Sequence, residues 1–446
     1  GGGAGAALPA GAGAGGGTGS APGGSPAVAG TAVPASGHGW DAKHVYVGVV
    51  TTKDTQQVYG SYGANNVDPG DTEAQATAVA TYLNAHGGIL GRTVVPIFHD
   101  IKTLDTAANP ASTGQSVCTF YTQDHPVVAV WNVNTQLDQS PTLRSCLAQG
   151  HVPLFTAAAR AISDAEMAHL APYYYHTIMV SWDAVTPVFV QRLKVQGWLG
   201  GWNPLLGQSD SSTAKVGILT DSTAQGVHTG EVLKAAFAKA GYPGAVIYQY
   251  SDPSQGQASS VYYFHGNGVT HVVVTDVELT AFQNAAESQH YHPRYGITSY
   301  NDPYSNLEAS GLTPTGANNG AMGVGWAPNL DVGDPNDPGE SAGGHVCNAI
   351  LKAANQNMVS KRLAHLYAFS ICDAFRVIAM GAGAGRGFSP QAIAAGVAQT
   401  GGSFSPANGF APALTGSRPY MQGAVRDLSW VTSCSCMRYG KATFAL

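Results

Sequence analysis

Polar side chains recur in this sequence where apolar, strand-like segments end. They are Thr51 and Thr52, Asn132 and Asn134, Thr156, Asp221, Asp276, and Tyr300 with Asn301. Hydroxyl, amide and carboxylate groups hold small polar molecules by hydrogen bonds, and ligands of open parallel sheets gather beyond the carboxyl ends of the strands. Each residue alone is equally explained as a helix cap that follows a strand. Their shared position indicates a binding site.

Local motifs for catalysis and for cofactors are missing from the sequence. It has no G-x-S-x-G elbow, no G-x-x-x-x-G-K-[ST] loop and no H-E-x-x-H pair. Gly11, Gly13 and Gly16 match G-x-G-x-x-G, but no strand precedes them and no helix follows. We therefore expect no enzyme and no cofactor. A hydrolase on a doubly wound sheet stays an alternative, because a triad assembled in space leaves no local motif.

Two groups of residues resemble metal ligands. His290 and His292 have the i, i+2 spacing of one strand face, but two ligands do not complete a site, and an exposed loop is favoured. An oxygen-rich segment contains Asp331, Asp334, Asn336, Asp337 and Glu340. It lacks the EF-hand spacing and is interrupted by two prolines, so a solvated loop is favoured and no metal site is expected.

The composition limits the class of partner. The chain has 446 residues, only 11% charged residues and a net charge of −6, so it lacks the basic surface that nucleic acid or an anionic membrane requires. No apolar run reaches the ~18 residues of a membrane-spanning helix. The sequence begins without an initiator Met or a secretory leader, which is typical of a mature or trimmed product.

Alternating helix and strand patterns predict two parallel sheets. Ala76, Val79, Ala80 and Leu83 form one helix face that ends at His86 with a glycine turn, and a strand follows. A first series of strands is expected at Val45 to Val50, Val94 to His99, Val127 to Asn132 and Val152 to Thr156. After a break at Tyr173 to Tyr175, a second series is expected at 215–220, 245–250, 271–275, 295–299 and 320–326, with a helix at 230–240. Two more helices are expected at 341–356 and 366–381.

The six cysteines favour disulfides in an oxidising compartment, because they form no C-x-x-C pairs. Two successive right-handed crossovers place the helices of Cys118 and Cys146 side by side, so this pair is expected. Cys347 and Cys372 each lie on a C-terminal helix and form the next candidate pair. Cys434 and Cys436 then remain, although six cysteines allow 15 connectivities.

The glycine turn also resembles a known family. Asn84, Ala85, Gly87, Gly88, Ile89 and Gly91 read N-A-x-G-G-I-x-G, followed by a strand and Asp100. This is similar to lobe I of the periplasmic-binding-protein type 1 family, the solute receptors of branched-chain amino acid ABC importers such as the leucine/isoleucine/valine-binding proteins. The resemblance in the order of elements runs from about Lys43 to Tyr439.

The resemblance implies an α/β fold of two Rossmann-like lobes with parallel sheets, joined by a three-stranded hinge. Residues 1–40 would form a flexible Gly/Ala-rich tether, residues 41–175 with 328–408 lobe I, and residues 176–327 with 409–446 lobe II. Hinges of this kind allow the two lobes to close on a ligand, as in a Venus flytrap.

The resemblance also implies the function. The chain would be the extracellular solute-binding protein of an ABC transporter, serving amino acid transport or the uptake of another small carboxylate or amide. Its partners would be the ligand and the permease subunits, without nucleic acid, and it would be a monomer. It would lie at the cell surface, anchored as a lipoprotein through an N-terminal cysteine that this sequence does not contain. The alternative is a ligand-sensing or cell-surface interaction module with a degenerate cleft.

The ligand contacts implied by the resemblance come from both lobes. The loops Trp131 to Thr135 and Thr156 to Arg160 would face a ligand carboxylate. The full set is Thr52, Tyr59, Tyr62, Asn132, Asn134, Thr156, Ala158, Arg160, Gln225, Asp276 and Tyr300.

Two positions depart from the members that bind amino acids, which place a small hydroxyl residue near Arg160 and an acidic residue near Tyr300. An arginine fork suits a carboxylate, whereas a tyrosine holds a cation only weakly, so Asp276 or Asp221 would have to supply the anion. A surface or inter-lobe ion pair is the competing interpretation of Arg160.

Overall fold

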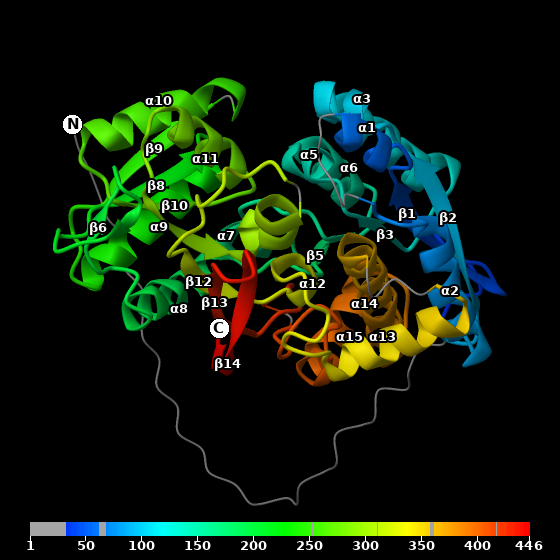
Figure 1. The fold of residues 1–446 in the computed structure, drawn as a ribbon. Coiled ribbons are helices and arrows are strands. Elements are labelled where there is room, and N and C mark those ends of the chain that lie inside the picture. Colours follow the sequence, from blue (N-terminus) through cyan, green and yellow to red (C-terminus); the bar gives the residue numbers. More distant parts are fainter. Residues whose placement is uncertain (1–32, 62–67, 252, 310, 357–360, 416) are drawn as a thin grey trace, which may run out of the picture. The chain divides into compact units, whose positions relative to one another are not determined.

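Two β-sheets flanked by helices organise the chain (Figure 1). The computed structural model describes residues 33–61, 68–251, 253–309, 311–356, 361–415 and 417–446, and residues 34–446 form one unit. The fold is α/β with two lobes, as the sequence predicted.

The sheet of lobe I is entirely parallel, with the strand order β2-β1-β3-β4-β5. Its strands are β1 (His44–Thr51), β2 (Thr93–Asp100), β3 (Ala129–Asn132), β4 (Leu154–Thr156) and β5 (Tyr174–His176). The first four were predicted. The predicted break at Tyr173 to Tyr175 is wrong, because this segment forms β5, where the Tyr175 ring stacks on Phe155 at 4.7 Å.

Short helices connect these strands. They are α1 (Thr55–Ser61), α2 (Thr72–Ala85), α3 (Thr103–Ala108), α4 (Pro110–Thr119), α5 (Thr135–Gln139), α6 (Pro141–Gln149) and α7 (Asp164–Leu170). Helix α2 begins at the Asp71 cap, and its end at His86 was predicted. Gly88 follows with φ +68°, and a Cβ there would lie 2.0 Å from the carbonyl oxygen of Arg92, so the turn into β2 requires glycine.

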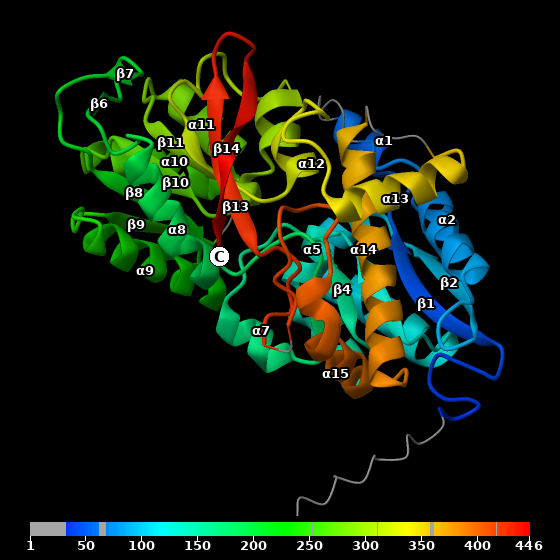
Figure 2. The same ribbon diagram turned by 90° about the horizontal axis from the view of Figure 1, so that it is seen from below.

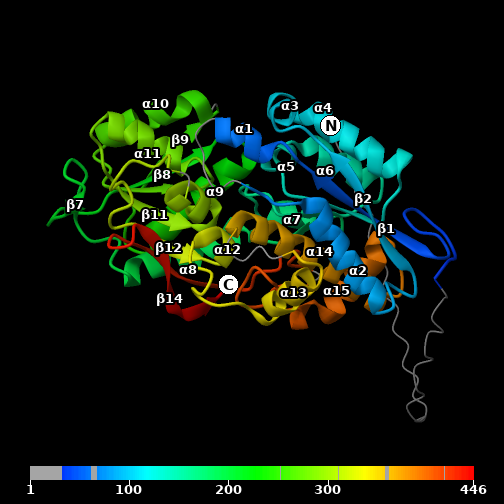
Figure 3. The same cartoon turned by 45° about the vertical axis from the view of Figure 1, so that its right-hand side comes forward.

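The sheet of lobe II has the order β14-β13-β12-β11-β10-β8-β9. Its parallel strands are β8 (Val216–Asp221), β9 (Val246–Tyr250), β10 (His271–Val274), β11 (Arg294–Thr298) and β12 (Met322–Gly325), all at predicted positions. The hairpin of β13 (Ala424–Val431) and β14 (Cys436–Ala445) was not predicted and adds two antiparallel strands beside β12 (Figure 3).

The helices of lobe II are α8 (Trp182–Val195), α9 (Ala224–Lys239), α10 (Pro253–Gly266) and α11 (Leu279–Ser288), with the short turns η2 (Ser299–Asn301) and η3 (Pro303–Ala309). A small hairpin of β6 (Trp202–Asn203) and β7 (Gln208–Ser209) lies between α8 and β8. Helix α9 covers the helix predicted at 230–240 and starts earlier, at the Thr223 cap.

The chain crosses between the two sheets three times. It leaves β5 for α8, returns after β12 through α12 (Pro328–Asp331) to α13 (Ala342–Ala353), α14 (Arg362–Gly385) and α15 (Pro390–Thr400), and leaves again for β13. Hydrogen bonds join the crossings, since His176 pairs with Tyr420 and Asn329 donates to Asn408 at 2.8 Å. The lobe limits predicted from the sequence stay a prediction.

Helix α14 is 24 residues long and, by length and composition alone, apolar enough to cross a membrane. The expectation from the sequence that no apolar segment is long enough to span a membrane therefore has to be corrected. In this fold 72% of its apolar window is buried, and the helix packs against α2, α15 and β3 (Figure 2). It is a core helix of lobe I.

Three disulfides are present. Cys118–Cys146 joins α4 to α6, Cys347–Cys372 joins α13 to α14, and Cys434–Cys436 closes the turn between β13 and β14. Of the expected tether, residues 1–32 lie outside the described residues. Its last residue, Trp40, packs on Phe388 of lobe I with ring centroids 5.4 Å apart.

Candidate functional site

The predicted contacts of lobe I meet at the ends of β3 and β4. Asn132 and Thr156 are register partners on neighbouring strands, and both are fully buried. Asn132 Oδ1 accepts from the amide of Asn134, and Thr156 Oγ1 accepts from the amide of Ala158 at 3.1 Å. Asn134 also caps α5 by accepting from Leu137. These side chains therefore shape the two loops, as the helix-cap interpretation expects.

The contacts predicted after β1 are only partly described. Thr52 is half-buried, and its carbonyl oxygen accepts from Thr55 at 2.8 Å. Tyr59 is a residue of α1, and Tyr62 lies outside the described residues.

Arg160 forms a buried ion pair inside lobe I. Its Nε donates to Asp138 at 2.6 Å, Nη1 and Nη2 donate to the two oxygens of Glu166 at 3.0 and 2.9 Å, and the remaining donors reach the carbonyl of Ala161 and the hydroxyl of Tyr174. All five guanidinium donors are thus used. The competing ion-pair interpretation is the one the structure favours, although the pair is neither on the surface nor between the lobes.

Charge balance explains why this cluster is stable. Burial alone would raise the pKa of Asp138, but the charges of Arg160 and Arg144 lower it below its usual value, so the carboxylate stays ionised. Burial lowers the pKa of the neighbouring His176 to about 3, which keeps that imidazole neutral. Arg144 and Arg160 each form ion pairs with both Asp138 and Glu166, so two positive charges face two negative ones.

Carboxyl groups gather at the strand ends of lobe II. Asp276 follows β10 and is 6% exposed; it accepts from the hydroxyl of Tyr250, at the end of β9, and from the amide of Glu278 at 2.9 Å. Burial raises the pKa of Asp276 to about 6, and burial together with Asp276 raises the pKa of Glu278 to about 7. Within the described residues no arginine, lysine or histidine pairs with either acid, and two such acids favour a bound cation or a shared proton.

Gln225 lies in the first turn of α9 and is half-buried. Its Oε1 has no hydrogen-bond partner among the residues that the structure describes. A buried acceptor of this kind is a candidate for ligand or water contact.

Tyr300 is fully buried beside the first crossing. Its hydroxyl donates to the carbonyl of Val180, its ring stacks on Trp182 at 4.9 Å, and Trp326 packs edge-on at 5.5 Å. Tyr300 therefore joins lobe II to the crossing segment in this conformation. Trp182 and Trp326 were not singled out from the sequence, since nothing local marks them. Tyr250 and Glu278 were also missed, although Tyr250 ends a predicted strand.

Two of the candidate metal ligands, His292 and Asp331, contact other side chains of the protein. His292 Nδ1 lies 3.3 Å from Glu287, and His290 is exposed. The expectation of a solvated loop is wrong for Asp331, which is fully buried and accepts from Ser299 at 2.7 Å and from Tyr439. Burial raises the pKa of Asp331 to about 7. No group of three or more metal-binding side chains occurs within the described ranges.

Comparison with known proteins addresses the fold. No family model matches the chain, and neither does any curated protein. Among solved structures, a periplasmic binding protein type 1 from Bordetella pertussis Tohama I matches with a TM-score of 0.63 and 13% identity, over 89% of this chain and 99% of that chain. The fold is that of the type 1 periplasmic binding proteins.

Two further structures share the type 1 fold with this chain. A solute-binding protein of an ABC transporter from Rhodopseudomonas palustris HaA2, in complex with p-hydroxybenzoic acid, matches with a TM-score of 0.61 and 13% identity, over 90% of this chain and 97% of that chain. A branched-chain amino acid ABC transporter protein from Thermus thermophilus with bound valine matches with a TM-score of 0.57 and 12% identity, over 91% and 96%.

Proposed function

We propose that this chain is an extracellular solute-binding protein of an ABC importer, which binds a small polar molecule between two lobes. The observation that carries the proposal is the presence of polar strand ends on both sheets of a type 1 fold, at Asn132 and Thr156 in one lobe and at Asp276 in the other. The structures with this fold that are described above hold p-hydroxybenzoic acid and valine. An amino acid or another small carboxylate or amide is therefore the expected class of ligand.

The charged groups near the strand ends indicate which part of a ligand each lobe would bind. Asp276 and Glu278 suit an ammonium group, because a cation would stabilise their ionised forms. Arg160 has no donor left for a ligand carboxylate. The amides of Asn134 and Ala158 already donate within these loops, so the carboxylate would have to be held by other donors of the inter-lobe site.

Closure supplies the mechanism of binding, and no chemical reaction is part of the proposal. The three crossings allow the lobes to move without unfolding either core. A ligand that contacts both lobes stabilises the closed form by its differential affinity for that form. The closed, loaded protein would then be recognised by the permease subunits at the cell surface.

A ligand-sensing or cell-surface interaction module is the second candidate. The observations that favour it are the engagement of Arg160 within lobe I and the complete burial of Tyr300. Both side chains were expected to contact a ligand, and both instead form hydrogen bonds with other residues of the protein.

A thermal-shift screen of amino acids, small carboxylates, amides and sugars separates the two candidates. A solute present at 100 times its Kd stabilises the folded protein by about 2.7 kcal/mol, so a true ligand raises the melting temperature clearly. An Asp276→Asn variant should lose the response to an ammonium-bearing ligand. A broad panel without any response would favour the module.

A further inference from the structure

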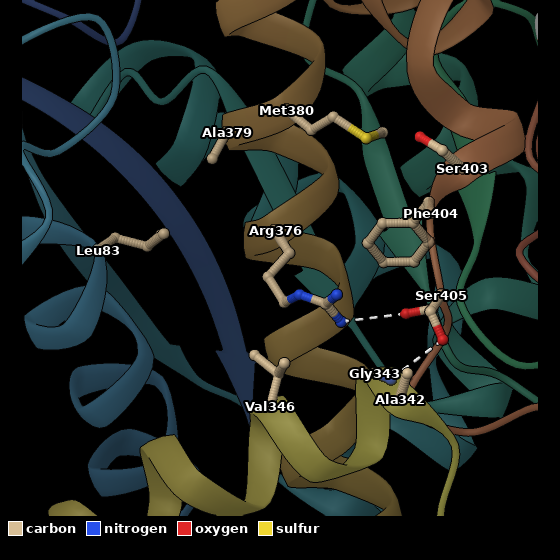
Figure 4. A pocket seen from close by; sticks show the side chains of 10 residues that line it. All are labelled: Leu83, Ala342, Gly343, Val346, Arg376, Ala379, Met380, Ser403, Phe404 and Ser405. Carbon is tan, nitrogen blue, oxygen red and sulfur yellow. Dashed lines mark hydrogen bonds between the residues drawn. The ribbon is translucent and has the colours of Figure 1, made fainter.

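A groove of about 420 Å³ lies on lobe I, away from the strand ends described above. It is bounded by α2, α13, α14 and the segment 403–405 (Figure 4). The lining residues are Leu83, Ala342, Gly343, Val346, Arg376, Ala379, Met380, Ser403, Phe404 and Ser405. Arg376 is the one charged residue among these ten, and none of them carries a carboxylate.

The groove lies toward the amino ends of the strands. Leu83 belongs to the last turn of α2, and the next residue, Asn84, exchanges hydrogen bonds with Val94 near the start of β2, at 3.0 and 2.7 Å. The proposed inter-lobe site lies at the carboxyl ends of the same strands. A molecule in the groove would therefore not occupy the inter-lobe site.

The guanidinium of Arg376 presents an unused edge. Nη1 donates to Asp373 at 3.0 Å and to the carbonyl of Ser405 at 3.3 Å, and the group lies over the Phe404 ring at 4.7 Å. These contacts fix its orientation. Nε and Nη2 have no hydrogen-bond partner in the part of the chain that the structure describes, and the side chain is 20% exposed. Two neighbouring donors of this kind form the fork that binds a carboxylate through both oxygens.

The start of α13 adds a second attraction for an anion. Ala342 and Gly343 are the first residues of this helix of 12 residues, and both line the groove. The positive end of the helix dipole therefore points toward the same end of the groove as Arg376. Ser405 holds the two parts together, because its carbonyl accepts from Arg376 and its hydroxyl oxygen accepts from the Gly343 amide at 3.0 Å (Figure 4).

The remaining walls are apolar. Leu83, Val346, Ala379 and Met380 line the groove, and Val346 is 40% exposed, which is high for an apolar residue. The volume falls within the ~300–1,000 Å³ typical of small-molecule sites. We propose that this groove is a second binding site, for an aliphatic monocarboxylate of about eight carbon atoms in total.

Calorimetric titration of the full chain with octanoate tests the proposal, with octanol and octylammonium as probes of the head group. We expect octanoate to bind at least ten times more tightly than either control compound. Arg376→Gln should weaken octanoate at least tenfold. Arg386→Gln, which removes an exposed arginine at the end of the same helix, should leave the affinity unchanged.

A second variant guards against a folding defect, since Arg376→Gln leaves the buried Asp373 without its ion pair. Val346→Trp fills the groove from an exposed position, keeps Arg376, and should abolish octanoate binding. Octanoate affinity unchanged in both variants would overturn the proposal. So would equal binding of octanol, or no octanoate binding to the unaltered chain at millimolar concentration. Octanoate bound between the lobes would keep its affinity in both variants, so the variants distinguish the two sites.

Discussion

Arg160 and Asp138 form an ion pair in the interior of lobe I, where Nε donates to Oδ2 at 2.6 Å and the residues are 5% and 0% exposed. Arg160 also donates to the carbonyl of Ala161 and so fixes the loop after β4. Because this loop is one of the predicted ligand loops, Arg160 is a positioning residue for the candidate site. A substitution of Arg160 is therefore expected to lower the stability of the protein.

Arg160→Ala should destabilise the protein by about 3 to 5 kcal/mol, because it leaves the buried Asp138 and the half-buried Glu166 with one arginine fewer. Urea unfolding measures the loss. Lys102→Ala is the matched control, since it breaks an ion pair with Asp100 in which the lysine side chain is 55% exposed. That change should cost less than ~1 kcal/mol. Equal losses in the two variants would contradict the buried network.

Asp276→Asn should remove part of the pH dependence of stability. The folded-state pKa of Asp276 is raised from 3.8 to about 6, so the folded protein retains a proton that the unfolded chain has already released. The stability from this group is complete below pH 4 and is lost as the pH rises through 6. At pH 8 the variant should gain about 2 to 3 kcal/mol relative to the unaltered chain. At pH 3.5 the Asp276→Asn variant and the unaltered chain should be equally stable. Urea unfolding of both proteins at the two pH values measures the difference.

Tyr300→Phe removes the hydrogen bond from the hydroxyl to the carbonyl of Val180. We expect a loss of about 1 to 2 kcal/mol, because a buried carbonyl becomes unsatisfied. Tyr291→Phe is the control within lobe II, where the same kind of bond reaches the carbonyl of Val269 at 2.9 Å. Both variants should lose similar stability, whereas Tyr300→Phe alone should change the affinity for an inter-lobe solute. A matching change in Tyr291→Phe would argue against a special role for the crossing.

The Cys434–Cys436 disulfide should be reduced first. Cys434 is exposed and only one residue separates the pair, whereas Cys118, Cys347 and Cys372 are fully buried. A thiolate has to reach a sulfur atom to attack it. Mild dithiothreitol followed by alkylation and mass spectrometry should label Cys434 and Cys436 alone.

Removal of the same disulfides should give different losses of stability. The chain-entropy model gives about 3 to 4 kcal/mol for each of the two bonds between helices and less than ~2 kcal/mol for the short loop. Urea unfolding of paired Cys→Ser variants compares the three bonds. A larger loss for Cys434 and Cys436 than for Cys347 and Cys372 would contradict the expectation.

The sequence by itself determined the class of fold and most of the order of elements, with β5 and the β13–β14 hairpin as exceptions. Strands β1 to β4 and β8 to β12 fall at the predicted positions, and the apolar runs of the inner strands β3, β8, β10 and β11 are buried on both faces of a sheet. The end of α2 at His86 was predicted as well, because the glycines after it satisfy a local conformational need. Information of this kind lies within a few neighbouring residues.

Only the tertiary structure decided which polar groups remain available. From the sequence, Arg160 could either bind a ligand or form an ion pair. The contact that decides between these interpretations is with Asp138, which is 22 residues away. Tyr300 is occupied by Val180, 120 residues away. The groove at Arg376 combines residues from α2, α13 and α14, so no single stretch of sequence shows it. Local patterns encode propensity and burial, whereas the partner of a buried charge is set by which distant segments the fold brings together.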